Sequence, residues 1–177
     1  MPAEFDRGRL AAGIRDIPDF PRPGVVFKDV TPLLADHAAL TLAVDALTDV
    51  ADGAAIDVVV GMESRGFILG PPVALRLGAG FVPARKAGKL PGPTRRESFT
   101  LEYGEEVLEV HEDAISAGDR VLIVDDVLAT GGTASATARL VEGLGGEVVA
   151  FAFLLELAFL DGAAKLSGYR VTSLLTY

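Results

Sequence analysis

Residues 120–133 read R-V-L-I-V-D-D-V-L-A-T-G-G-T, and this stretch decides the fold. Residues 121–124 form an unbroken β-branched and aliphatic run, which is typical of a strand buried on both faces of a parallel sheet. Asp125 and Asp126 follow the run, so we expect them at the carboxyl end of that strand, where doubly wound sheets bind ligands. A glycine-containing turn and a helical pattern over residues 134–144 complete a strand–turn–helix unit.

The turn after the acids has the composition of a phosphate-binding loop. Its glycines let the backbone fold closely around a ligand. The first N–H groups of the following helix lack intrahelical acceptors, which favours a bound phosphate. The lysine of a Walker P-loop and the G-x-G-x-x-G of a dinucleotide-binding turn are both missing here. The residues that we assign to phosphate binding are Ala129, Thr130, Gly131, Gly132 and Thr133.

The composition is that of one globular domain over residues 1–177. Hydrophobic residues make up 50% of the chain, which is long enough for a sizeable core. The formal net charge of -9 argues against nucleic acid or an anionic membrane as a partner. There is no cysteine, which excludes disulfides and thiolate metal sites. The start lacks a signal-peptide pattern, and residues 148–160, the most apolar stretch, are too short to span a bilayer, so we expect a cytoplasmic enzyme.

Strand and helix signals alternate along the chain. Because crossovers between parallel strands are right-handed, this alternation between residues 37 and 147 predicts an α/β fold with a parallel sheet covered by helices on both faces. Helices are predicted over residues 5–17 and 37–51, an extended segment over 25–30, strands over 55–60, 81–84, 147–155 and 169–177, a β-hairpin from 99–103 and 107–112, and at most a short helix over 161–166.

Two further stretches carry charge where ligands bind. Residues 61–67, G-M-E-S-R-G-F, follow a strand and repeat the pattern of a glycine-bounded turn before a helix, now with an arginine. Residues 85–96, R-K-A-G-K-L-P-G-P-T-R-R, are strongly basic within an acidic chain, and their first half could grip a polyanion at a strand end. Arg95 and Arg96 fit a solvated face equally well. His37 and His111 have no partners at metal or triad spacing, so we expect them to be structural or surface residues.

The acid pair followed by T-G-G-T resembles the phosphoribosyl pyrophosphate (PRPP) motif of type I phosphoribosyltransferases. The flanking stretches resemble the adenine-specific members of that family and follow in the same order from residue 18 to residue 177. The resemblance implies transfer of the phosphoribosyl group of PRPP to adenine, which yields AMP and diphosphate in purine salvage. The stretches that carry it are P-G-V-V-F-K-D at 23–29, E-S-R-G-F at 63–67, R-K-A-G-K-L-P-G-P-T at 85–94 and S-F-T-L-E-Y-G at 98–104.

The resemblance also implies a role for each candidate residue. Asp125 and Asp126 would accept hydrogen bonds from the ribose hydroxyls and favour a cationic sugar in the transition state, and Glu102 would act as acid or base on adenine. Residues 129–133 would hold the 5′-phosphate. Adenine would stack on Phe27 while the backbone of Val26 and Lys28 reads its edge, and the diphosphate would be bound by Glu63, Ser64, Arg65, Arg85, Lys86 and Lys89.

Other features follow from the same resemblance. It implies Mg²⁺ as cofactor, held mainly by substrate oxygens and not by direct protein ligands, and a cis peptide between Glu63 and Ser64. Residues 1–36 would form a hood over the base, and residues 85–112 a basic loop and a flexible hairpin that closes the site. It further implies a homodimer in which Arg85 serves the neighbouring site.

Two alternatives stay open at this point. The PRPP motif is shared with enzymes for other bases, such as xanthine and hypoxanthine. The fold could also serve a regulator that senses PRPP, although a DNA-binding module usually has a basic face, and this acidic chain has no residues left over for one.

Overall fold

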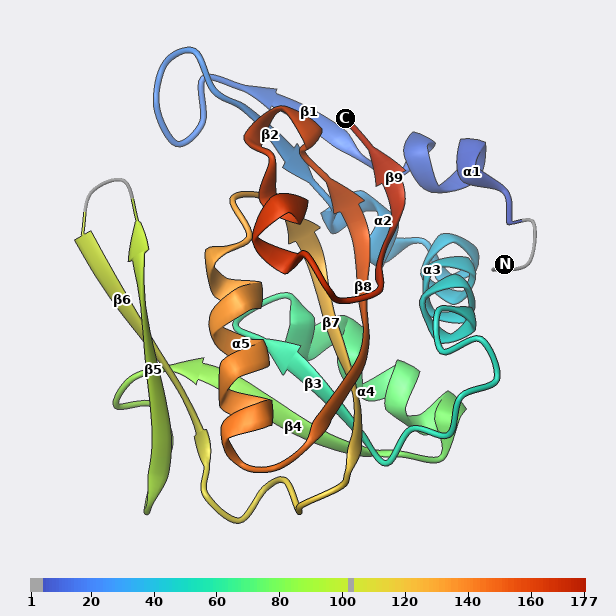
Figure 1. Cartoon of the computed structure of the whole chain (residues 1–177). Coiled ribbons are helices and arrows are strands. Elements are labelled where there is room, and N and C mark those ends of the chain that lie inside the picture. The colour runs from blue at the N-terminus through green and yellow to red at the C-terminus, as the bar shows by residue number, and fades with distance from the viewer. Residues whose placement is uncertain (1–4, 102–103) are drawn as a thin grey trace.

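A seven-stranded sheet in the order β5-β6-β4-β3-β7-β8-β9 forms the centre of the molecule (Figure 1). The computed structural model describes residues 5–101 and 104–177. The hairpin of β5 (Thr94–Leu101) and β6 (Gly104–His111) adds to the edge of β4 in antiparallel fashion. The strands that run parallel are β3 (Val58–Met62), β4 (Gly80–Lys86), β7 (Arg120–Leu128), β8 (Glu147–Glu156) and β9 (Val171–Thr176).

Helices cover both faces of the sheet, as the alternating sequence pattern predicts. On one face, α3 (His37–Asp49) and α4 (Gly66–Leu77) share one hydrophobic core with Leu122 and Val124 of β7. On the other face, α5 (Gly132–Gly143) packs against Val121 and Ile123 of the same strand. Successive side chains of a strand point to opposite faces, so the apolar run of β7 supplies both cores. The α/β prediction is confirmed.

The prediction of a short helix over residues 5–17 is wrong for its second half. Helix α1 (Arg7–Ala12) stops at Gly13, and β1 (Arg15–Pro18) pairs with β2 (Val26–Asp29) as a separate two-stranded sheet. Arg15 Nη2 lies 2.6 Å from Asp29 Oδ2 on the opposite strand, and such cross-strand ion pairs favour the extended conformation over the helix. The hairpin of β1 and β2 lies at the end of the central sheet where the C-terminus also lies (Figure 1). Helix α2 (Thr31–Ala35) then leads from this hairpin into α3.

The two strands next to the predicted phosphate loop differ from the predicted boundaries. Strand β3 begins and ends later than residues 55–60. Strand β7 continues through Asp125 and Asp126, which were expected to follow it. The reason is that β7 pairs with β8 as far as Leu128, whereas its pairing with β3 stops at Val124. The two acids therefore belong to a strand that extends beyond one of its neighbours.

Two other segments complete the comparison with the sequence prediction. Strand β5 is longer than expected and begins at Thr94, so Arg95 and Arg96 belong to a strand and not to the basic loop. The prediction of at most a short helix over residues 161–166 agrees with the 3₁₀ helix η2 (Gly162–Leu166), which follows a shorter one, η1 (Ala158–Leu160). Of the helices in residues 5–101 and 104–177, none combines the length and apolar character needed to cross a membrane.

The packing of β3 against α4 depends on two glycines. The ring of Phe81 lies between them, since a Cβ added at Gly61 would come within 2.7 Å of that ring and one at Gly70 within 2.5 Å. Both positions are therefore closed to any side chain, which fixes the distance between β3 and the helix that follows the E-S-R-G-F turn.

We predict that Gly70→Ala destabilises the protein by about 1–3 kcal/mol through overpacking. In an open helical position the same change would stabilise it by roughly 1 kcal/mol. Urea unfolding measures the difference, with Gly80→Ala as the control, because a Cβ there has its nearest neighbour at 3.7 Å. In a Phe81→Leu background the loss at position 70 should nearly vanish. A stabilising effect of Gly70→Ala in the wild-type background would contradict this account of the packing.

Candidate active site

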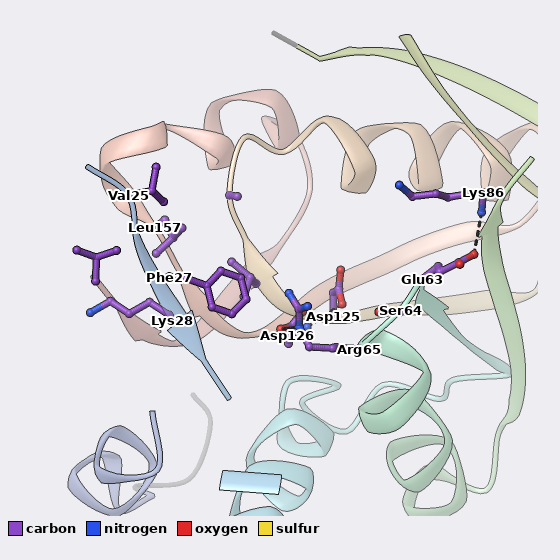
Figure 2. A pocket seen from close by; sticks show the side chains of 13 residues that line it. Val25, Phe27, Lys28, Glu63, Ser64, Arg65, Lys86, Asp125, Asp126 and Leu157 are labelled. Carbon is purple, nitrogen blue, oxygen red and sulfur yellow. Dashed lines mark hydrogen bonds and ion pairs between the residues drawn. The ribbon is translucent and has the colours of Figure 1, made fainter. Parts of the chain in front are cut away.

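A pocket of about 520 Å³ opens at the carboxyl ends of β3 and β7 (Figure 2). The hairpin β1–β2 forms one wall, the turn after β3 another, and the ends of β7 and β8 the rest. Most of the residues predicted for adenine, ribose and diphosphate therefore come together here. The lining residues are Val25, Val26, Phe27, Lys28, Glu63, Ser64, Arg65, Lys86, Asp125, Asp126, Val127, Ala129 and Leu157.

The predicted phosphate loop forms a second, smaller hollow beside this pocket. Residues 129–133 line it, and Asp125, Val127 and Ala129 belong to both hollows. Gly131, with φ +74°, is the N-cap of α5, and no side chain caps this helix start. A helix N-terminus of this kind presents backbone N–H groups and a positive dipole end to an anion.

Gly162 holds this loop from behind. A Cβ on Gly131 or on Gly162 would collide with the backbone of the facing segment, so η2 packs directly against the loop. Sequence reasoning missed Gly162, because nothing local shows that residues 129–131 and 162 meet. The contact makes the loop rigid without using any side chain that a ligand would need.

The two acids of β7 point to opposite sides of the strand (Figure 2). The carboxylate of Asp126 is buried and forms an ion pair with Arg65, which lies directly before α4. Asp125 lies on the side of α5 and lines the phosphate hollow, and its Oδ1 accepts a hydrogen bond of 2.9 Å from the N–H of Asp126. The prediction gave the two acids one shared role, whereas the structure gives them different surroundings.

These surroundings act on the charges of the pocket. Burial raises the pKa of Asp125 well above its usual value, and the neighbouring charge of Asp126 raises it further, outweighing the opposing effect of Arg65. Burial by itself would lower the pKa of Arg65, but the charge of Asp126, with smaller contributions from Asp125 and Asp29, raises it. Arg65 is therefore a permanent cation between the two acids and the hood.

The hairpin of β1 and β2 carries an aromatic pair, of which Phe27 lines the pocket. The ring centres of Phe27 and Phe20 lie 5.2 Å apart in an edge-to-face arrangement, and the guanidinium of Arg65 lies 5.7 Å from the Phe27 ring centre. The ammonium of Lys28 contacts Asp16 at 2.7 Å and lies 4.0 Å from the ring centre of Tyr177. Since its side chain is already engaged, Lys28 offers mainly its backbone to the pocket.

The end of β4 meets the pocket through Glu63. Its Oε2 accepts hydrogen bonds from Arg85 Nε at 3.3 Å and from the backbone N–H of Lys86 at 3.0 Å. The peptide between Glu63 and Ser64 is cis, as the resemblance implies. Lys86 lines the pocket, whereas Arg85 and Lys89 are not among the lining residues in the described part of the chain.

The remaining candidates lie elsewhere. Arg96 pairs with Glu109 at 3.1 Å, and the guanidinium of Arg95 lies where a side chain of Gly143 would be, so neither reaches the pocket. Glu102 lies outside the described residues. Within residues 5–101 and 104–177, no group of three His, Cys, Asp or Glu side chains is placed to hold a metal ion.

Three apolar lining residues were not predicted: Val25, Val127 and Leu157. Leu157 directly follows β8, so the rule that ligands bind at the carboxyl ends of parallel strands could have identified it. Val25 and Val127 neighbour predicted residues, and only the folded chain shows that they face the pocket.

Comparisons with known proteins agree on one family. Residues 33–170 match the phosphoribosyl transferase domain. The adenine phosphoribosyltransferase of Myxococcus xanthus is 59% identical over 168 residues, which cover 95% of this chain and 91% of the relative. The crystal structure of the enzyme of that name from Thermoanaerobacter pseudethanolicus has a TM-score of 0.94 at 49% identity and covers 97% of this chain and 100% of its own.

A third similar protein was solved with ligands bound. The Saccharomyces cerevisiae adenine phosphoribosyltransferase, solved with adenine and an imino-altritol bisphosphate, has a TM-score of 0.90 at 41% identity. The alignment covers 96% of this chain and 98% of the yeast chain.

The raised pKa of Asp125 predicts a dependence of stability on pH. A carboxyl whose pKa is higher in the folded than in the unfolded state stabilises the fold while protonated, and this contribution is lost as pH rises through the folded pKa. We therefore expect Asp125→Asn to raise the melting temperature at about pH 8, by roughly 2–4 °C for each kcal/mol, and to have little effect near about pH 4.

Thermal melts of the ligand-free protein across this pH range measure the effect. The amide oxygen that Asp125→Asn introduces can still accept the hydrogen bond from the N–H of Asp126, so the change removes charge and keeps the contact. Asp113→Asn, at an exposed carboxylate in the turn after β6, is the matched control. An Asp125→Asn variant less stable than wild type at about pH 8 would contradict the assigned direction.

Proposed function

Because the chain belongs to the adenine phosphoribosyltransferase family, we propose that its pocket transfers the phosphoribosyl group of PRPP to adenine. In this reaction a ring nitrogen of adenine bonds to C1 of the ribose, the bond from C1 to the diphosphate oxygen breaks, and the proton on that nitrogen is removed. The observation that carries the proposal is the junction at Asp125. One carboxylate lines both the phosphate hollow and the pocket that the aromatic hood covers.

The phosphate hollow fixes one end of PRPP. Backbone N–H groups at the start of α5, with the hydroxyls of Thr130 and Thr133, suit the 5′-phosphate. The hollow is held rigidly by the contact between Gly131 and Gly162. A phosphate bound here would place the ribose over the end of β7, next to the two acids.

The acids of β7 serve the sugar in different ways. Asp125 is poised to accept hydrogen bonds from the ribose hydroxyls, and its negative charge, once ionised, favours the cationic sugar of the transition state. Asp126 is already bound to Arg65 and so controls where that arginine lies. Its charge adds to the same negative field beneath the ribose.

The diphosphate end takes the cations of the pocket. Arg65, Lys86 and the turn at Ser64 face the pocket. Arg85 would be supplied by the neighbouring chain of a homodimer. Mg²⁺ bound mainly by PRPP oxygens would neutralise charge on the leaving group, without a direct protein ligand. These positive charges would thereby stabilise the negative charge that builds on the departing diphosphate.

Adenine fits the hood. The Phe27 ring gives a stacking surface, Val25 and Leu157 add apolar walls, and the backbone at Val26 and Lys28 can read the edge of the base. Phe20 supports the ring of Phe27 from its edge. Glu102, by resemblance, would remove the adenine proton.

We propose the cytoplasm as the compartment, since a chain without cysteine needs no oxidising environment.

A symmetric homodimer is part of the proposal. Arg85 lies outside the lining of its own pocket, and its guanidinium lies 5.7 Å from the ring centre of Phe67 on α4. The same helix carries the exposed apolar side chains of Ile68 and Leu75. An apolar face next to a cation outside its own pocket supports an arrangement in which one chain's Arg85 serves the diphosphate bound by the other.

Turnover of PRPP with single bases tests the function. We expect diphosphate release with adenine and at most a small fraction of that rate with guanine, hypoxanthine or xanthine, because the hood resembles that of the adenine-specific enzymes. Diphosphate release assayed with each base in parallel gives the answer. Equal or faster turnover with xanthine or hypoxanthine would assign the enzyme to that base, and tight PRPP binding without any turnover would indicate a sensor.

The dimer is tested by mixing two inactive variants, Arg85→Ala and Glu102→Gln. If Arg85 acts on the neighbouring chain, a mixed dimer has one site with both groups and one with neither. Random pairing makes half of the dimers mixed, so about a quarter of wild-type activity should return after joint refolding. Mixed dimers that form without any recovery would place Arg85 in its own chain's site.

A further inference from the structure

A carboxylate away from the pocket is completely buried. Glu109 lies in the middle of β6, and its exposed fraction is 0%. It faces Arg85 of β4 on one side and Arg96 of β5 on the other. Directly opposed residues of antiparallel strands point to the same face, so these three side chains form a row across the sheet.

Four donors satisfy the carboxylate. Its Oε1 accepts hydrogen bonds of 3.0 Å from the backbone N–H groups of both Lys89 and Leu90. Its Oε2 accepts from Thr94 Oγ1 at 3.2 Å and from Arg96 Nε at 3.1 Å. Burial alone would raise the pKa of Glu109, but these donors together lower it, so the buried group is an anion.

These contacts hold the basic loop, residues 87–93, against β6. Alternate residues of the strand each bind one part of the loop. The carbonyl of Val107 accepts from Ala87 at 2.9 Å, Glu109 binds the middle of the loop, and the ring of His111 lies 2.8 Å from the carbonyl of Pro91. The prolines of this loop have no N–H to donate. Glu109 therefore binds two of the few backbone donors that the loop has.

The loop in turn holds Arg85. The carbonyl of Lys89 accepts a hydrogen bond of 3.2 Å from Arg85 Nη1, and the N–H of the same residue is bound to Glu109. Arg85 Nε reaches Glu63, whose backbone turns into the pocket at Ser64. A continuous path of hydrogen bonds thus runs from the buried carboxylate to the edge of the active site.

We propose that Glu109 is a positioning residue for the diphosphate end of the substrate, acting through the basic loop on Arg85. The inference rests on the proposed function, because it assigns Arg85 to the diphosphate bound by the neighbouring chain. A charged anchor suits this role, since two backbone N–H groups and a guanidinium converge on one point that no apolar side chain could hold together. The hydrogen bonds of the Glu109 carboxylate go to Lys89, Leu90, Thr94 and Arg96, none of which lines the phosphate hollow or the pocket, so its effect should be confined to one end of the site.

Ligand binding to the full-length protein tests the assignment. Glu109→Gln keeps the shape but turns an NH₂ group towards one pair of donors, and Glu109→Asp keeps the charge but shortens the reach. By calorimetry, we expect both variants to bind magnesium diphosphate about tenfold more weakly and AMP within about twofold of wild type. The KM for PRPP should rise while the KM for adenine stays unchanged. Glu97→Gln, which removes a 3.2 Å pair with Arg139 on the same hairpin, is the matched control and should change the binding of neither ligand.

Each outcome decides between the possibilities. Unchanged diphosphate binding in both variants would overturn the assignment, and so would an equal loss of diphosphate and AMP, which would show a merely structural role. If Glu109→Gln does not fold, Glu109→Asp alone decides by the same comparison. Wild-type protein that bound neither ligand would overturn the proposed function itself, whereas wild type that bound both, with unchanged variants, would overturn only the role of Glu109.

Discussion

The active site depends on one feature of the sheet: β7 is longer than β3. Pairing with β3 ends at Val124, but β7 remains bonded to β8 as far as Leu128. The acids are thus held in strand geometry where β3 no longer covers them. Because strand residues alternate, this geometry sends Asp126 towards Arg65 and Asp125 towards the phosphate loop. A loop at this position could not separate two adjacent carboxylates so reliably.

The buried charges of the molecule fall into two kinds. Asp126 and Glu109 each have fixed cationic or N–H partners, so their burial is compensated within the protein. Asp125 is compensated less, and its pKa is raised accordingly. A carboxylate whose charge the protein compensates poorly is well suited to accept hydrogen bonds from the hydroxyls of a ligand. The fold is less stable for having this charge, and the same charge gives the site its capacity to bind.

Local patterns in the sequence were sufficient for the fold class and for the strand, turn and helix around the two acids. The run before Asp125 and the glycines after it are consecutive residues, and each carries its signal without help from elsewhere. What could not be predicted depends on segments that meet only in the folded chain. Arg15 pairs with Asp29 on a neighbouring strand, so the segment that was expected to be helical is extended. The two acids belong to β7 because its pairing with β8 continues past them. The burial of Glu109 could not be predicted either, because its hairpin alternates polar and apolar residues in the ordinary way. Gly162 is the same kind of case, since its constraint comes from a facing backbone.

The two ends of the pocket are built with different stiffness, and the proposed reaction gives a reason. The phosphate loop is held by direct backbone contact between Gly131 and Gly162, which has no rotamers to change. The diphosphate end is held by side chains, from Glu109 through Arg85 to Glu63, each of which can turn about several bonds. The 5′-phosphate stays on the ribose in both substrate and product, so a rigid cradle serves both. The diphosphate must be gripped and then released, which requires contacts that can loosen without disturbing the sugar.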